Sequence, residues 1–466
     1  MRVLALLVSL CACGDDDAMP FCFTEEGRGV VAGGVDPDDP CRVCDARTAR
    51  LRPHWASGCG AEVVLEDPMS YFAIPELGPD ADGDAVGDIA LFGGLVPEGG
   101  TTCNCLEVRS VATGSLIARL VDQANVNRVQ MRLGPDADGD GLADLLVGSS
   151  AALADLGDPF DAFTAGQNPD PGRVVLYSPL LNAVVHEWVG ESDCRALGYW
   201  VDLGPDVDGD GLADPMIADP GCVEIEETPD GPTTAGAFGG HVTIYSGASD
   251  EVIQRWSAPE GMSGFGNHGR FVPDQNGDGI EDVVLYLTPD RGPDVADQVW
   301  LLDPVSGATI RTWRWERGDE PFAYLRHQWL GYDLTGDGEM DAVGRLNATE
   351  VGGPLPRPVG VLPSLDRPVG SLTVYGNDIS PDALHIVPDV DGDGAADVLF
   401  GDPETGELRL LNAWNEVLWS MAYDEPQMFP QVSRGFDVDN DGLVDFATID
   451  DGDFVSVRIF LSRGLP

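Results

Sequence analysis

Clusters of aspartates separated by single residues recur seven times along this chain of 466 residues. The clearest cluster, GPDADGDGLAD at residues 134–144, contains four carboxylates and three glycines. Carboxylates held this close repel one another unless a cation lies between them. Ca²⁺ takes about six to eight oxygen ligands, and a tight loop can supply them from alternate positions, with glycine at the sixth position to permit the turn. The spacing therefore predicts a calcium site in each cluster.

The nine residues from the first to the last aspartate of a cluster form one predicted loop. In the second loop, positions one, three, five and nine are aspartates, position seven offers a backbone carbonyl, and Gly141 makes the turn. Position nine is the expected bidentate ligand. An EF-hand places its bidentate Glu at position twelve on a helix, whereas here position nine opens an apolar strand, so an EF-hand is excluded. The expected ligands are Asp136, Asp138, Asp140, Leu142 and Asp144.

The other six loops, numbered in chain order, provide the same positions. Their expected ligands are Asp80, Asp82, Asp84, Val86 and Asp88; Asp206, Asp208, Asp210, Leu212 and Asp214; Asp274, Asn276, Asp278, Ile280 and Asp282; Asp333, Thr335, Asp337, Glu339 and Asp341; Asp389, Asp391, Asp393, Ala395 and Asp397; and Asp437, Asp439, Asp441, Leu443 and Asp445.

Three loops depart from the pattern. The first has Ala85 where glycine belongs, which strains the turn; the fourth has Asn276 as a neutral ligand; and the fifth has Thr335 at position three. Asp and Gly are also common in solvated turns, but retention of the ninth aspartate in every repeat argues against turns alone. Seven equivalent acid pairs would likewise be unusual for catalysis by paired carboxylates.

The spacing of the loops indicates the fold. The first aspartates are 48 to 70 residues apart, too far for helical solenoids and suited to one four-stranded propeller blade per repeat. Each loop is followed by a short apolar run, such as 145–150, and then by alternating strands, such as 172–178 and 183–190. We therefore expect an all-β, seven-bladed β-propeller over residues 61–466. The stretch AEVVLE at 61–66 is expected to add the outer strand of the last blade.

Repeats of the form DxDGDGxxD, each followed by an apolar strand and glycine, resemble the FG-GAP repeats of integrin alpha-subunit propellers and their bacterial relatives. The FG and GAP signatures themselves are reduced to forms such as FGG and VGSS. The resemblance implies a propeller that holds structural Ca²⁺, up to seven ions here, and that serves as a binding or adhesion module.

The N-terminus indicates export. MRVLALLVSLCACG has one Arg, a short apolar run and then small residues, which is typical of a secretory signal peptide and too short for a membrane span. Residues 10–13 resemble a bacterial lipobox, so we expect a signal peptide at 1–12, lipidation of Cys13 and a tether at 13–20. An ordinary signal peptide is the alternative.

Residues 21–60 form a predicted Cys-rich module. Cys22, Cys41, Cys44 and Cys59 lie in a segment with little apolar content, and in an exported protein they favour two disulfides whose pairing the sequence does not decide. A zinc site that includes His54 is the rival interpretation. The expected order is thus a lipoprotein signal peptide, a small Cys-rich disulfide module and the propeller.

Composition limits the function. All 26 basic residues are Arg, and 80 acidic residues give a net charge of −54, which excludes a nucleic-acid partner. Six scattered histidines and the absence of nucleophile or zinc motifs give no catalytic site. We expect a secreted or outer-membrane, cell-surface lipoprotein, monomeric, attached to the membrane only by lipid, with a protein or glycan ligand. A propeller-scaffolded hydrolase and a calcium-dependent lectin are the alternatives.

Overall fold

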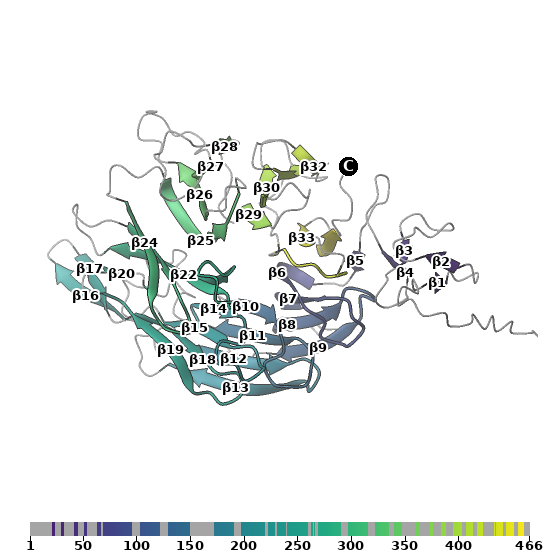
Figure 1. Ribbon diagram of the computed structural model, residues 1–466, viewed down its shortest axis with the longest axis horizontal. Coiled ribbons are helices and arrows are strands. Elements are labelled where there is room, and N and C mark those ends of the chain that lie inside the picture. Colours follow the sequence, from purple (N-terminus) through teal and green to yellow (C-terminus); the bar gives the residue numbers. More distant parts are fainter. Residues whose placement is uncertain are drawn as a thin grey trace, which may run out of the picture. The chain divides into compact units, whose positions relative to one another are not determined.

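The structure is a computed structural model, and strands account for its regular secondary structure (Figure 1). It divides into two compact units, Met1–Ala61 and Glu62–Pro466. It describes residues 21–23, 29–31, 42–44, 51–53, 63–66, 69–95, 103–121, 129–149, 172–190, 197–219, 222–228, 231–238, 240–259, 262–263, 265, 269–289, 297–315, 322–334, 340–346, 359–362, 373–375, 384–387, 395–402, 407–412, 417–422, 433, 435–440, 444–451 and 455–460.

The first unit contains two small antiparallel hairpins. One pairs β1 (Phe21–Phe23) with β2 (Gly29–Val31), and the other pairs β3 (Arg42–Cys44) with β4 (Leu51–Pro53). The signal peptide, Cys13, the tether, Cys41 and Cys59 lie outside the described residues, so the lipid anchor and the disulfides stay predictions.

The second unit is a series of antiparallel sheets, five of which have four strands. Strands consecutive in the chain pair side by side, as Figure 1 shows for β10 to β13. The first two of these sheets are β6 (Met69–Gly78), β7 (Asp88–Leu95), β8 (Cys103–Ser110) and β9 (Leu116–Val121); and β10 (Val129–Gly134), β11 (Asp144–Ser149), β12 (Arg173–Ser178) and β13 (Ala183–Val189).

The other three four-stranded sheets follow the same plan. The third carries an inserted hairpin of β16 (Cys222–Thr228) and β17 (Gly231–Phe238). The three sheets are β14 (Trp200–Leu203), β15 (Pro215–Asp219), β18 (His241–Tyr245) and β19 (Val252–Ser257); β25 (Phe322–Tyr332), β26 (Asp341–Leu346), β27 (Val359–Leu362) and β28 (Thr373–Tyr375); and β29 (Leu384–Val387), β30 (Asp397–Asp402), β31 (Glu407–Leu411) and β32 (Val417–Ala422).

The prediction of a seven-bladed propeller is wrong: the structure has five four-stranded blades. Two further sheets depart from that plan. One has five strands, because two short strands, β20 and β21, both pair with β22. The other has three, because the described residues before β33 form no strand: they make the bridge Phe436–Asp445 and the hydrogen bond from the Ser433 N–H to the Ala447 carbonyl. The strands are β20 (Met262–Ser263), β21 (Gly269–Val272), β22 (Asp282–Pro289), β23 (Asp297–Leu302) and β24 (Thr309–Trp315); and β33 (Phe446–Asp451), β34 (Val455–Phe460) and β5 (Val63–Glu66).

The first strand of each sheet contacts the first strand of a neighbouring sheet, which is the arrangement of a β-propeller. These contacts run from β6 to β10, β14, β21, β25 and β29, and β33 contacts β6 again. The strand expected from AEVVLE is confirmed, because β5 pairs antiparallel with β34, with Leu65 opposite Val457. A segment near the start of the unit therefore covers the edge of a sheet near its end.

Apolar side chains between neighbouring sheets form the core. Leu133 and Leu145 of the second sheet pack with Ala90 and Val108 of the first, and Leu77 of β6 packs with Ile459 of β34. Tryptophans contribute to these interfaces: Trp188 of β13 packs with Leu203 and Ile217 of the third sheet, and Trp256 of β19 belongs to a cluster with Val283 and Leu285 of β22.

A charged network joins the first strands. Arg132 of β10 donates a hydrogen bond to Glu76 of β6 over 2.5 Å, and its Nε lies 3.4 Å from Asp202 Oδ1 of β14. Asp202 Oδ2 in turn accepts the backbone N–H of Phe271 in β21. Four consecutive sheets are thus connected by groups that are largely buried, where breaking one partner of an ion pair is strongly destabilising. Among the described residues there is no helix long and apolar enough to cross a membrane.

Candidate metal centres

In the first six repeats the Asp-rich loop lies between two paired strands, and in the seventh it precedes β33. In the second sheet the loop leaves β10 after Gly134 and enters β11 at Asp144, and these two residues are directly opposite in the pairing register. Position nine is the first residue of the following strand in five repeats, and in the third and seventh it directly precedes the strand, because β15 begins at Pro215 and β33 at Phe446. The side chain at position nine is buried in all seven loops: the exposed fraction is 1% for Asp445 and 0% for the other six.

The carboxylates of the second loop fold the backbone around themselves. Asp136 accepts hydrogen bonds from the N–H groups of Gly139 at 2.7 Å and Gly141 at 2.8 Å. Asp138 Oδ1 accepts from Asp140 N at 3.0 Å, and Asp144 Oδ2 accepts from the N–H of Ala137 at 2.8 Å. One oxygen of each side chain at positions three and nine is thereby occupied.

The other oxygens at these two positions have no partner. Asp138 Oδ2 and Asp144 Oδ1 are buried and make no hydrogen bond. One oxygen from each of Asp136, Asp138 and Asp144 lies within 4.8 Å of the other two. Buried polar atoms are nearly always paired, and a buried anionic oxygen without a partner is especially unfavourable. The residues therefore fit a cation bound between them.

A proline explains why Asp144 Oδ1 is left without a donor. In the first sheet the equivalent oxygen of Asp88 accepts the N–H of Val111 at 3.3 Å, and in the third sheet that of Asp214 accepts the N–H of Gly247 at 2.9 Å. The corresponding residue of the second sheet is Pro179, which has no N–H to donate.

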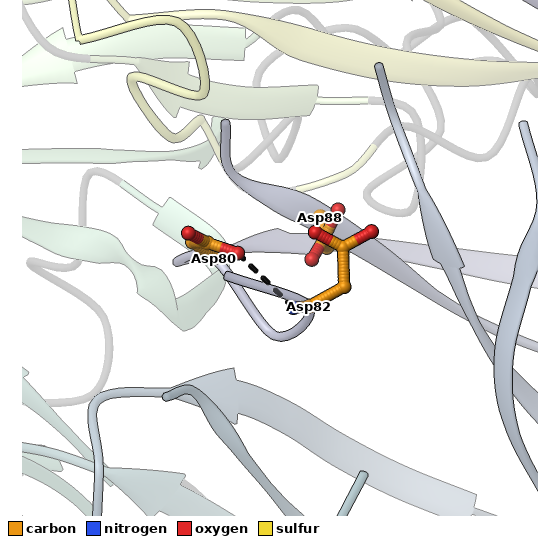
Figure 2. Close-up of side chains that lie close together, drawn as sticks. All are labelled: Asp80, Asp82 and Asp88. Carbon is orange, nitrogen blue, oxygen red and sulfur yellow. Dashed lines mark hydrogen bonds between the residues drawn. The ribbon is translucent and has the colours of Figure 1, made fainter. Parts of the chain in front are cut away.

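Four loops bring three carboxylates together in this way. Figure 2 shows the first, in which the Asp82 side chain lies beside Asp88 while its N–H donates to Asp80. Within each group the oxygens lie within 4.8 Å of one another. The groups are Asp80, Asp82 and Asp88; Asp136, Asp138 and Asp144; Asp206, Asp208 and Asp210; and Asp437, Asp439 and Asp445.

The predicted carbonyl ligands at position seven are held by the loop itself. In the first four loops the N–H at position seven donates to Oδ1 at position five, for example Leu142 to Asp140 at 2.9 Å. The other pairs are Val86 to Asp84, Leu212 to Asp210 and Ile280 to Asp278.

Several predicted ligands lie outside the described residues: Thr335, Asp337, Glu339, Asp389, Asp391, Asp393, Asp441 and Leu443. Where the flanking residues are described, they repeat a contact of the other loops. The N–H at position two donates to Oδ2 at position nine, from Leu334 to Asp341 at 2.7 Å and from Val438 to Asp445 at 2.9 Å. In the sixth loop Ala395 and Asp397 are both buried.

The fourth loop differs, because Asn276 presents its amide nitrogen to the neighbouring carboxylates. Asn276 Oδ1 accepts the N–H of Asp278, so Nδ2 donates to Asp278 Oδ2 at 3.1 Å and to Asp282 Oδ1 at 3.2 Å. The amide thus partners two oxygens that carry negative charge. Oxygen coordination by Asn276, as the sequence suggests, would require the amide to turn over.

Two features of the loops were not predicted from the sequence. Serines at the end of the third strand donate to position five, with Ser178 Oγ 3.2 Å from Asp140 Oδ2 and Ser246 Oγ 3.1 Å from Asp210 Oδ2. The recurring pair Tyr-Ser before a turn could have indicated them. Glycines at position four, such as Gly139, also have positive φ, so each of the first four loops has two residues in the left-handed region rather than one.

Burial raises the pKa of position nine. The pKa of Asp88 and of Asp144 rises to about 8, and that of Asp214 to about 6. Desolvation is the main cause, opposed by backbone hydrogen bonds and reinforced by the neighbouring aspartates. Full ionisation of these carboxylates therefore needs a compensating positive charge.

The comparisons with known proteins yield structural likeness only. No family model matches the chain, and no curated protein matches it. Among solved structures, the exotype rhamnogalacturonan lyase YesX has a TM-score of 0.49 and 12% identity, over 96% of this chain and 86% of that one. Kuenenia stuttgartiensis hydrazine synthase has a TM-score of 0.47 and 11% identity, over 88% of this chain and 99% of that one. The Dos1 propeller has a TM-score of 0.43 and 10% identity, over 84% of this chain and 95% of that one. At these TM-scores the likenesses assign neither family nor activity.

Relief of backbone strain at position six is the first prediction. Ala85 has φ of +67° where the second loop has Gly141 at +89°. A Cβ on Gly141 would meet nothing within 4 Å, so Gly141→Ala is expected to lower the free energy of unfolding by about 1 kcal/mol through backbone strain alone. Ala85→Gly is expected to raise it by a similar amount. Denaturant unfolding in calcium measures both changes in free energy. A loss of stability in Ala85→Gly would contradict the claim that Ala85 strains the backbone of the first loop.

The raised pKa of Asp144 predicts the pH dependence of the chelated protein. Between about pH 4, the ordinary value for Asp, and pH 8 the folded state retains a proton that the unfolded state has released. The melting temperature in chelator is therefore expected to fall as pH rises through this window.

Asp144→Asn removes one of these titrations and keeps the size of the side chain. Its melting temperature in chelator is expected to fall less steeply with pH than that of the wild type. The comparison cancels the effect of repulsion among all other acidic groups, which the two proteins share. Parallel curves for the two proteins would show that Asp144 does not hold the proton.

Proposed function

We propose that this chain is an exported, calcium-stabilised β-propeller of the FG-GAP type that acts as a binding or adhesion module at the cell surface. The observation that carries the proposal is the pair of buried, unpartnered oxygens of Asp138 and Asp144. Carboxylate and carbonyl oxygens are the ligands of hard cations, and a flexible set of six or more suits Ca²⁺ better than Mg²⁺. Up to seven ions would be held, one in each loop.

The calcium sites have a structural role in this proposal. Position nine is a fully buried residue in the strand register, so a cation bound there ties the loop to the start of the second strand. A site of this kind does not exist in the unfolded chain, and its binding free energy therefore adds to folding. Extracellular calcium would keep the propeller rigid.

Export and anchoring rest on the N-terminal sequence. The signal peptide at 1–12 and lipidation at Cys13 would place the protein outside the cell and attach it to the outer membrane only by lipid, with the Cys-rich module between anchor and propeller. The propeller would then present a rigid, anionic surface to a protein or glycan ligand, and monomers are sufficient for this role.

A binding role fits the described residues better than a lectin or a hydrolase. Of the tryptophans whose side chains are described, Trp188, Trp200, Trp256 and Trp313 are buried and Trp300 is partly buried, so little of their ring surface is open for stacking on sugars. The sequence contains no catalytic motif, and the carboxylates with raised pKa lie in the loops that fit cations.

Removal of one ligand tests the calcium role. Asp144→Ala is expected to lower the melting temperature in calcium and to shrink the difference between calcium and chelator, because one ion no longer contributes about 2.7 kcal/mol, the value for free calcium at a hundred times the dissociation constant. Glu251→Ala, at an exposed carboxylate outside the loops, is the matched control and is expected to keep the full difference. An unchanged chelator response in Asp144→Ala would exclude the second loop as a calcium site.

The binding role is tested separately. Full-length protein, immobilised in calcium, is presented with a glycan array and with a panel of chromogenic glycoside and ester substrates. No substrate is expected to be turned over. Turnover that persists through purification and disappears in chelator would support the enzyme instead, and retention of a glycan in calcium alone would support the lectin.

A further inference from the structure

Backbone hydrogen bonds join the loops of neighbouring sheets directly. The N–H of Ala143 donates to the carbonyl of Asp80, and the N–H of Ala213 donates to that of Asp136, each over 2.8 Å. Ala396 donates to Asp333 in the same way, also at 2.8 Å. In all three the acceptor is position one of one loop and the donor is position eight of the next.

The seventh loop is joined to the first, which lies at the other end of the unit in sequence. Gly87, at position eight of the first loop, donates to the carbonyl of Val438 at 2.6 Å. Asn440 Nδ2 also donates to the carbonyl of Ala85 at 3.2 Å. The loops at 80–88, 136–144 and 206–214 therefore form one hydrogen-bonded series, which Val438 and Asn440 extend to the described part of the seventh loop.

Small side chains at position eight permit this close approach. Residues that donate are Gly87, Ala143, Ala213 and Ala396. A Cβ on Gly87 would lie 3.0 Å from Val438 Cα and 2.5 Å from the Gly78 carbonyl oxygen, so glycine is required there. The fourth and fifth loops have Glu281 and Met340 at position eight, and neither makes the corresponding bond among the described residues.

These bonds act on the residues that would bind the cation. Between the first and second loops and between the second and third, the acceptor at position one is itself a ligand. Its carbonyl fixes the peptide between positions seven and eight of the next loop, which carries the position-seven carbonyl. Asp136 thus contributes a carboxylate to its own site and holds Ala213, the residue before Asp214. Order imposed by a cation on one loop is passed to the next loop by a single bond.

We infer that the first, second and third loops bind Ca²⁺ as one coupled array, in which occupation of one loop raises the affinity of its neighbours. The inference rests on the proposed calcium role. Coupling between sites is reciprocal and is commonly 5- to 150-fold in affinity, and we expect about tenfold between adjacent loops. The fourth loop lies outside the array.

Two substitutions at the same loop position test the coupling. Asp140→Ala removes position five of the second loop, and Asp278→Ala removes position five of the fourth; neither alters the backbone bonds between loops. Native mass spectrometry of the full chain counts bound ions during a calcium titration, and circular dichroism in saturating calcium confirms that each variant is folded. If Asp140→Ala does not fold, Asp140→Asn replaces it.

Asp140→Ala is expected to lose its own ion and to need about ten times more calcium to fill two further sites, whereas Asp278→Ala is expected to lose one ion and leave the rest of the titration unchanged. The inference is overturned if both variants lose one ion and their remaining curves coincide with the wild type. A wild-type chain that binds no calcium would instead overturn the proposed function, and with it the coupling.

Discussion

Repulsion among buried carboxylates is the constraint on which this propeller depends. Each loop gathers acidic side chains just before a strand, and the last of them is withdrawn from water. Backbone N–H groups satisfy part of the oxygens, as with Ala137 and Asp144. In the second loop Asp138 Oδ2 and Asp144 Oδ1 remain buried without a hydrogen bond, and burial raises the pKa of Asp144, so a cation is the partner that the site lacks.

The loops differ in how they meet this constraint, and the differences follow from single residues. Pro179 has no N–H to donate, so Asp144 Oδ1 is left without a hydrogen-bond donor. The Gly247 N–H supplies that donor to Asp214 in the third sheet. In the fourth loop the Asn276 amide lies among the carboxylates as a neutral donor. Loops that are nearly identical in sequence are thus expected to differ in affinity for calcium.

Much of the site could be predicted from the sequence because it is local. Alternation of Asp with Gly specifies the turn, and the apolar run after position nine specifies the strand that buries it. The partner of the β5 strand was also predictable, since an unpaired apolar stretch before the first sheet had to cover an edge.

The remaining features depend on contacts between distant residues. Seven loops suggest seven equal blades, yet β20 and β21 share one partner, and the described residues before β33 form an isolated bridge at Phe436 and no strand. The serine contacts and the bonds between loops join residues from different strands and sheets. Sequence spacing alone does not determine such contacts.

Anomalous diffraction from crystals grown in calcium tests the central claim most directly. The account predicts a peak in the second loop at about 2.3–2.6 Å from Asp138 Oδ2 and Asp144 Oδ1, with weaker density in the fourth loop beside Asn276. Well-ordered loops at full calcium, with water alone between Asp138 and Asp144, would contradict it.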